Sequence, residues 1–267
     1  MSKKRLKKLK LYRDQRITTV YRYFLGLDVR LKAVDEAFSI EQIVPYFQPI
    51  FELASHKVMR YECLSRLISK DDKMYLPSEF LSIIDRSQSS AQLTQRILEL
   101  SSAYCASKGM RWSINMFPSD LRDVKLVNWM QNLLGNLNSN LGGVELTYDS
   151  VKDHPHLLKN LIDKLPNIHV TIDDVHTFED KLIDVLSTGV HAIKVRGDMV
   201  TRFARTGQSK IIIVDMLKQC HICQCDFIAE HIEDELTLEA VRSLGIKFGQ
   251  GYFLSEPQGR MSNLKQA

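Results

Sequence analysis

The sequence predicts a (β/α)8 barrel of the TIM type with an N-terminal basic helical extension. Short apolar segments alternate with longer amphipathic segments from Ile43 onward, a pattern that predicts mainly parallel strands joined by helices. The length of 267 residues suits a barrel of about 250 residues with a short appendage. Polar side chains also recur where the predicted strands end. A doubly wound open sheet would give the same alternation, so that alternative stays open.

The predicted elements follow one another in a regular order. Strands are expected over 46–51, 58–65, 112–116, 144–147, 168–172, 191–195, 227–229 and 251–254. Helices are expected from Leu76-Pro77-Ser78 and over 91–107, 120–135, 155–164, 177–187, 208–219 and 234–244. Proline and serine at the start of the first helix are typical of a helix N-terminus. We therefore divide the chain into an arm over residues 1–40 and a barrel domain over 41–267.

The N-terminal arm is strongly basic. Residues 1–32 contain eleven Lys or Arg and two Asp, so the rest of the chain carries a net charge of −5 because the whole chain is +4. Apolar residues recur in the arm at helical spacing. Such a helix suits anionic lipid, nucleic acid or a partner protein, or it is a solvated helix packed on the body. We expect no nucleic-acid partner, and we keep a protein partner open.

Composition limits the protein class further. Hydrophobic residues make up 44% of the chain, but no apolar run reaches the roughly 18 residues that a membrane helix needs. The basic N-terminus also lacks the apolar stretch of a signal peptide, so we expect a cytoplasmic protein. Five cysteines, an odd number, predict reduced thiols. The group Cys220, Cys223 and Cys225 could form a zinc or redox cluster, but buried thiols fit its place before a strand better.

Polar residues at the strand ends carry the functional prediction. They are Glu62, Arg66, Asn115, Glu145, Asp173, Asp174, Lys194, Glu230, Glu233 and Gln250. The C-terminal ends of barrel strands meet at one mouth, so these side chains are expected to surround a common point. Clustered carboxylates repel one another unless cations neutralise them, and carboxylate and carbonyl oxygens suit hard ions such as Mg²⁺ or Mn²⁺. The pair Asp173-Asp174 could bridge two ions about 3.5–4 Å apart, as in two-metal phosphoryl sites.

Eight segments between Pro45 and Pro257 resemble the EAL domain family of cyclic di-GMP phosphodiesterases. Tyr61-Glu62-Cys63-Leu64-Ser65-Arg66 matches the signature that names the family, with cysteine in place of alanine. The other matching segments are Tyr46-Phe47-Gln48-Pro49-Ile50, Ile114-Asn115-Met116, Glu145-Leu146-Thr147, Thr171-Ile172-Asp173-Asp174, Ile193-Lys194-Val195, Ile228-Ala229-Glu230-His231-Ile232-Glu233 and Gly249-Gln250-Gly251-Tyr252-Phe253.

This resemblance implies roles for individual residues. Glu62, Asn115, Glu145 and Asp173 would hold one Mg²⁺ or Mn²⁺ ion, and Asp173 and Asp174 would share a second. Lys194 would orient the attacking water, while Glu230 and Gln250 would assist at the metal and the water. Gln48, Leu64, Arg66 and Glu233 would contact the dinucleotide.

The sequence departs from the family pattern in the loop after the paired aspartates. The family has Phe-Gly-Thr-Gly there, and this chain has Val175-His176-Thr177-Phe178. Glycine permits backbone conformations that His and Phe disfavour, so we expect the loop to follow another path or to be strained. The glutamate that braces this loop in the family is Tyr148 here. The second ion, a homodimer contact and a partner of this loop therefore stay open.

Other departures lie near the expected mouth, where Arg196, His231 and Phe117 replace Asp, Gly and Ser of the family. The leading hypothesis is a metal-dependent phosphodiesterase that hydrolyses cyclic di-GMP to linear pGpG and so controls motility or biofilm. The alternative is a catalytically inactive member that binds cyclic di-GMP or a protein and acts as a regulator. We also expect that restoring glycine at positions 176 and 178, with glutamate at 148, raises turnover.

Overall fold

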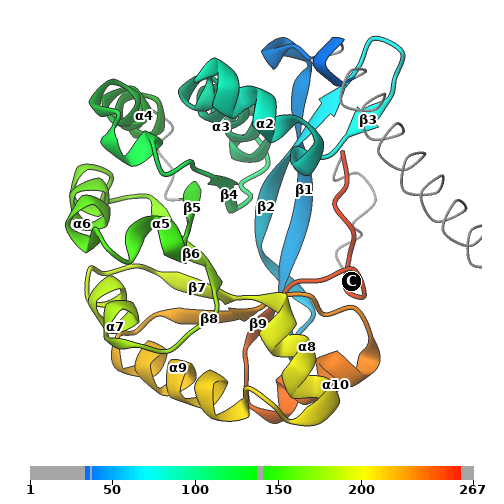
Figure 1. Cartoon of the computed structure of the whole chain (residues 1–267), viewed down its shortest axis with the longest axis vertical. Helices are drawn as coiled ribbons and strands as arrows, with labels where there is room; N and C mark the ends of the chain where they lie inside the picture. Colours follow the sequence, from blue (N-terminus) through cyan, green and yellow to red (C-terminus); the bar gives the residue numbers. More distant parts are fainter. Residues whose placement is uncertain (1–33, 37, 137–140, 260–267) are drawn as a thin grey trace, which may run out of the picture.

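Strands form the centre and helices the outside of the computed structural model, which describes residues 34–36, 38–136 and 141–259 (Figure 1). The strands are β1 (Ile43–Glu52), β2 (Lys57–Ile68), β3 (Met74–Tyr75), β4 (Trp112–Asn115), β5 (Gly143–Thr147), β6 (His169–Val175), β7 (Ala192–Val195), β8 (Asp226–Ala229) and β9 (Phe248–Gly249). Most of the basic arm lies outside the described residues. None of the helices in the described part has the length and hydrophobicity that a membrane span needs.

The sheet closes on itself. Strand pairing runs β1-β9-β8-β7-β6-β5-β4-β2, and β2 then pairs with β1. All pairs from β2 through β4 to β9 are parallel, while β1 pairs antiparallel with both β2 and β9. The closed ring confirms the predicted barrel and excludes the open sheet. The antiparallel β1 arises because β1 and β2 form a hairpin with no helix between them.

The helices surround the barrel (Figure 1). They are α2 (Pro77–Ser87), α3 (Ser90–Ala106), α4 (Val124–Asn136), α5 (Tyr148–Val151), α6 (Pro155–Lys164), α7 (Asp180–Leu186), α8 (Gly197–Thr206), α9 (Lys210–Ile222) and α10 (Glu235–Ser243), with 3-10 turns at Ile40–Gln42 and Asp120–Arg122. Glu79 accepts a hydrogen bond from the backbone N–H of Leu76 at 2.8 Å, which satisfies a free donor at the start of α2. Asp234 caps α10 by accepting from the N–H of Thr237 at 2.8 Å.

The structure corrects three details of the predicted element order. The last strand of the barrel is β9 at Phe248–Gly249, whereas the predicted segment 251–254 lies after it and contains a turn. Gln250 therefore follows the last strand and does not precede it. Helices α5 and α8 and the short β3 were not expected. Helix α8 follows β7 without a Ser or Asp N-cap, so the usual start signal is absent there.

An apolar layer inside the barrel positions the site above it. Ile50, Ala192, Ile228 and Phe248 form a small cluster of their own on β1, β7, β8 and β9. Side chains on a strand alternate between its two faces, so the next inward residues toward one end of the barrel are Gln48, Lys194, Glu230 and Gln250. The hydrocarbon layer thus separates a polar C-terminal mouth from the opposite end of the barrel.

Candidate active site at the C-terminal mouth

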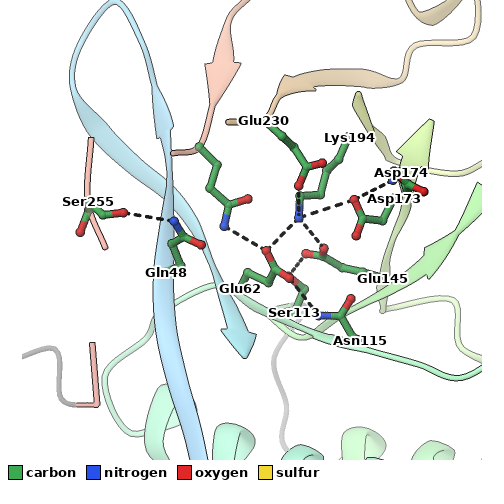
Figure 2. A network of polar contacts seen from close by, with 11 residues as sticks. Gln48, Glu62, Ser113, Asn115, Glu145, Asp173, Asp174, Lys194, Glu230 and Ser255 are labelled. Atoms are coloured by element: carbon green, nitrogen blue, oxygen red, sulfur yellow. Dashed lines mark hydrogen bonds and ion pairs between the residues drawn. The ribbon is translucent and has the colours of Figure 1, made fainter. Parts of the chain in front are cut away.

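A single ammonium group lies among four carboxylates. The Nζ atom of Lys194 lies 2.8 Å from Glu62, 3.0 Å from Glu145, 3.0 Å from Glu230 and 3.8 Å from Asp173, measured to the nearest carboxylate oxygen (Figure 2). These residues belong to four strands or strand ends, namely β2, β5, β6 and β8. The barrel therefore brings together groups that are far apart in the chain.

Further hydrogen bonds fix the orientation of two of these carboxylates. Glu62 accepts from the side-chain amides of Asn115 and Gln250, each at 2.9 Å. Glu145 accepts from the hydroxyl of Ser113 at 2.5 Å. The structure brings together Asn115, Gln250, Lys194 and the four carboxylates as predicted. Ser113 was not predicted, although it lies two residues before Asn115 and so faces the same side of β4.

Burial and mutual repulsion set the protonation of the acidic groups. Burial raises the pKa of Glu230 to about 8, and burial together with the charge of Glu62 raises the pKa of Glu145 to about 7. Burial also raises the pKa of Asp173. Burial would raise the pKa of Glu62 as well, but Lys194 and two amide donors outweigh it and lower that pKa. Four carboxyl groups therefore share one ammonium group, and three of them have raised pKa values that resist ionisation.

Lys194 remains charged although it is buried. Burial alone would lower the pKa of its ammonium group, but the surrounding carboxylates, led by Asp173, outweigh that effect and hold the pKa well above its ordinary value. The side chain is 1% exposed. Such a buried charge is stable only when it is paired, so the lysine and the carboxylates depend on one another.

Asp173 and Asp174 occupy different environments. Asp173 faces Lys194, whereas the Asp174 carboxylate lies 3.8 Å from Nε of Arg196. The Arg196 guanidinium also donates to Asp198 at 2.7 Å. Asp174 has a φ of 58°, in the left-handed region that non-glycine residues rarely adopt, and the register of β6 against β7 shifts here. The backbone thus turns Asp174 away from the lysine and toward Arg196.

The altered loop is held by contacts that replace the family's brace. The hydroxyl of Tyr148, a fully buried residue, donates to the carboxylate of Glu179 at 2.8 Å. The His176 ring packs edge-on against the Tyr148 ring, with centroids 5.9 Å apart, and its Nδ1 lies 2.9 Å from the carbonyl oxygen of Asp174. Tyr148 and His176 therefore act together as supports for the backbone at Asp174.

The predicted substrate residues are spread over the same end of the barrel. Gln48 donates to the carbonyl of Ser255 at 3.1 Å and lies beside the carboxylate network (Figure 2). The Arg66 guanidinium lies 5.6 Å from the centre of the Tyr46 ring. Leu64 is half-buried beside Tyr46 in the β1–β2 pairing. Glu233 is exposed, 3.7 Å from the His231 ring, and no contact with the carboxylate network is found for it among the described residues.

The C-terminal mouth contains donor groups of the type that a divalent cation prefers, namely carboxylates and amides. Within the described residues, no group of three or more His, Cys, Asp or Glu side chains converges closely enough to form a metal site. The chemical type of the donors nevertheless fits a hard cation, because several carboxylates and two amide groups share one mouth. The buried Oε1 of Gln250 has no hydrogen-bond partner among the described residues. The donor types of Glu62, Glu145, Asp173 and Asn115 thus suit such an ion, although the carboxylates among the described residues do not converge on one point.

The cysteines of the group Cys220, Cys223 and Cys225 are free thiols in the structure. All five cysteines are free, and Cys220 and Cys225 are buried. No metal-binding group of three is found in the described part of the chain. Buried thiols, the simpler interpretation of this segment, agree with the structure.

Comparison with known proteins places the chain in a family. The sequence profile described as "EAL domain" matches residues 31–257. The chain belongs to the EAL domain family. Among curated relatives, this EAL domain is 20% identical over 243 residues to the cyclic di-GMP phosphodiesterase PdeB of Shewanella oneidensis, a match that covers 87% of this chain and 28% of that protein. It is 21% identical over 218 residues to the cyclic di-GMP phosphodiesterase PdeF of Escherichia coli, which covers 77% of this chain and 29% of that protein.

Solved structures support the same fold. The FimX EAL domain from Pseudomonas aeruginosa, bound to c-di-GMP, superimposes with a TM-score of 0.76 at 19% identity, covering 88% of this chain and 97% of that one. The EAL enzyme Bd1971, in a form with cAMP and cyclic di-GMP bound, gives a TM-score of 0.75 at 20% identity, covering 95% and 72%. The EAL domain described here spans less than a third of the length of the first curated relatives it matches.

Proposed function

We propose that this EAL domain is a divalent-metal-dependent phosphodiesterase that opens one phosphodiester of cyclic di-GMP to give linear pGpG. The observation that carries the proposal is the contact of Lys194 with carboxylates from four strands at the C-terminal mouth. Curated relatives named as cyclic di-GMP phosphodiesterases support the substrate. The resulting decrease in the cyclic di-GMP concentration would in turn control motility or biofilm formation.

The chain's own residues have distinct parts in this proposal. Arg66, positioned against Tyr46, binds a phosphate of the dinucleotide through charge-assisted hydrogen bonds. Gln48, Leu64 and Glu233 line the path of the ligand. Glu230, whose side chain is 21% exposed, can receive a proton from a water molecule, whereas Glu145 is fully enclosed. Lys194 orients that water and keeps Glu62 and Glu145 in place.

Mg²⁺ or Mn²⁺ bound by Glu62, Asn115, Glu145 and Asp173 would neutralise the carboxylates and stabilise the charge that develops on the phosphate. Asp174 would take part in holding a second ion. The pairing of Asp174 with Arg196 competes with that role, because the guanidinium already supplies the carboxylate with a positive partner.

The competing contact favours a second candidate function. In this alternative the EAL domain binds cyclic di-GMP without cleaving it and acts as a regulator. Binding requires Arg66 and the mouth as a whole, whereas cleavage also requires Asp174 to be available.

Product analysis separates the two functions. The protein is incubated with cyclic di-GMP and either Mg²⁺ or Mn²⁺, and the nucleotides are resolved by chromatography. We expect linear pGpG, which is absent with EDTA and with Glu62→Gln, while a Lys218→Ala variant on the distant helix α9 retains the activity. Tight binding of cyclic di-GMP in Ca²⁺, with no pGpG in Mg²⁺ or Mn²⁺, would overturn the enzyme and support the regulator.

A further inference from the structure

The end of the barrel opposite the carboxylates contains a polar cavity of about 520 Å³. Its charged and histidine lining residues are Arg60, Arg111, His169, His191, Asp226 and Lys247. Met59, Ile168 and Phe248 add an apolar wall. The cavity lies on the other side of the apolar layer. Arg60 comes two positions before Glu62 on β2, and Asp226 on β8 comes four positions before Glu230, so both face inward nearer the N-terminal ends of their strands. It is therefore separate from the active site.

Arg60 is the distinctive residue of this cavity. The residue is 3% exposed, and its Nη1 donates to the carbonyl oxygens of Trp112 at 2.6 Å and Leu141 at 3.2 Å. These bonds fix the plane of the guanidinium. Its Nε is buried and has no hydrogen-bond partner among the described residues. A buried donor without a partner is costly, and the same residue lines the cavity.

Gly143 leaves the space that Arg60 occupies. A Cβ at this position would lie 2.7 Å from Nη1 of Arg60 and 2.9 Å from the carbonyl oxygen of His169. The absence of a side chain at Gly143 on β5 thus makes room for the buried guanidinium of Arg60 on β2. This arrangement presents a rigid guanidinium, which loses little conformational freedom when it binds a ligand.

The charge of the cavity favours an anion. Arg60, Arg111 and Lys247 are cationic and oppose the single carboxylate of Asp226. Arg60 and Arg111 are close enough to repel each other, and burial together with Arg111 lowers the pKa of Arg60 only to about 10, so it stays charged at neutral pH. Asp226 interacts with Lys247 and His191, so it neutralises part of the positive charge. The cavity as a whole carries two excess positive charges.

We propose that this N-terminal mouth binds a small phosphate-bearing molecule, with its phosphate between Arg60, Arg111 and Lys247. Guanidinium groups pair with phosphate in a forked geometry, and lysine adds a point charge. The cavity is larger than a phosphate group, so the apolar wall beside Phe248 leaves room for an organic part of the ligand. This inference does not depend on the proposed phosphodiesterase activity.

Binding is measured by NMR with inorganic phosphate and pyrophosphate as probes. The side-chain Nε–H of Arg60 gives its own signal in a ¹⁵N–¹H correlation spectrum, so it reports on the cavity directly. The protein is kept in EDTA, so that cation-dependent binding at the carboxylate mouth does not contribute. We expect a saturable shift of the Arg60 signal and of the ring signals of His169 and His191, absent with sodium chloride at equal ionic strength.

Variants test whether the charged lining causes this shift. Arg111 and Lys247 are exposed, so Arg111→Ala and Lys247→Ala are expected to fold and to weaken binding roughly tenfold each, the effect of losing one charge-assisted contact. Lys218→Ala, also an exposed lysine, is the matched control and should bind as the unmodified protein does. Arg60→Lys keeps the positive charge but removes the forked guanidinium geometry. This variant should bind pyrophosphate more weakly than the unmodified protein does. No saturable shift, or equal affinity in Lys247→Ala and Lys218→Ala, would overturn the proposal.

Discussion

The hydroxyl of Tyr148 donates to the carboxylate of Glu179 at 2.8 Å, and this contact joins the end of β5 to the loop that follows β6. Tyr148 is fully buried, and burial, followed by the bond to Glu179, raises the pKa of its phenol above the ordinary range. The bond is therefore one between a neutral donor and a charged acceptor. It holds the loop that follows β6, close to Asp174 at the end of that strand.

Replacing Tyr148 by glutamate is predicted to destabilise the protein. The new carboxylate would be buried close to Glu179, and two like charges at such a site repel each other. We expect Tyr148→Glu to lower the melting temperature measured by calorimetry, more than Tyr148→Phe, which loses only a hydrogen bond of about 1–2 kcal/mol. Tyr148→Glu combined with Glu179→Gln should recover much of the loss. Equal stability of Tyr148→Glu and Tyr148→Phe would contradict this account.

The contact between Tyr148 and Glu179 also bears on the expectation that restoring the family's loop residues raises turnover. Glycine at positions 176 and 178 with glutamate at 148 leaves Glu179 in place as a like-charged neighbour. We now expect a gain only when Glu179 is changed as well.

Removing the Arg196 guanidinium is predicted to increase the number of bound cations. Arg196→Ala releases Asp174 from its 3.8 Å ion pair, so the carboxylate becomes available to an ion. The stoichiometry of Mn²⁺ binding, measured by electron paramagnetic resonance, should rise in this variant. Arg202→Ala is the matched control, because Arg202 pairs with Asp198 at 2.9 Å and has no recorded contact with Asp174 among the described residues. A rise in both variants would mean that Asp198, and not Asp174, is the group released.

Replacing Lys194 by methionine is predicted to make stability dependent on divalent cations. The buried ammonium is the positive charge shared by Glu62, Glu145, Glu230 and Asp173. Removing one partner of a buried ion pair costs about 3–5 kcal/mol. In EDTA, thermal unfolding of Lys194→Met should occur at a lower temperature than that of the unmodified protein.

Added Mg²⁺ should then stabilise Lys194→Met more than the unmodified protein, because the ion replaces the missing charge. Lys218→Met, on the surface, serves as the control for the substitution itself. An identical response of the Lys194→Met and Lys218→Met variants to Mg²⁺ would show that the four carboxylates do not attract the ion.

His169 predicts a loss of stability in mild acid. Burial, followed by the charge of Arg60, lowers its folded-state pKa to about 2, while an unfolded histidine titrates near 6.5. His191 and Arg111 also face this ring and add no negative charge. The unfolded state therefore takes up a proton first, so the stability present above pH 6.5 is lost as the pH falls below it. By pH 5 the loss from this group is about 2 kcal/mol.

Denaturant unfolding at pH 7 and pH 5 measures this difference. His169→Gln should reduce the decrease between the two pH values, whereas His156→Gln, at an exposed position, should leave it unchanged. NMR titration of the His169 ring should find no protonation between pH 7 and 5. An ordinary pKa near 6.5 for this ring would contradict the prediction.

The sequence was sufficient to predict the barrel and most of the polar residues at its C-terminal mouth, because strand periodicity and strand ends leave local signals. Gln250 was recognised although its strand was predicted to begin three residues too late, at 251 where β9 begins at Phe248, since a two-residue strand has little periodicity. The antiparallel direction of β1 was not predicted, because the local sequence pattern does not reveal which strands pair with one another. The contacts of Arg196 with Asp174, and of Tyr148 with Glu179, depend on side-chain paths that only the folded chain defines.

The apolar layer of Ile50, Ala192, Ile228 and Phe248 has one further consequence. It places a negatively charged end and a positively charged end of the barrel on either side of hydrocarbon, where charges are weakly screened. Glu145 and Arg60 already interact across this interior. A cation bound at one end and an anion bound at the other would therefore each strengthen the binding of its counterpart by the same factor, as thermodynamic linkage requires.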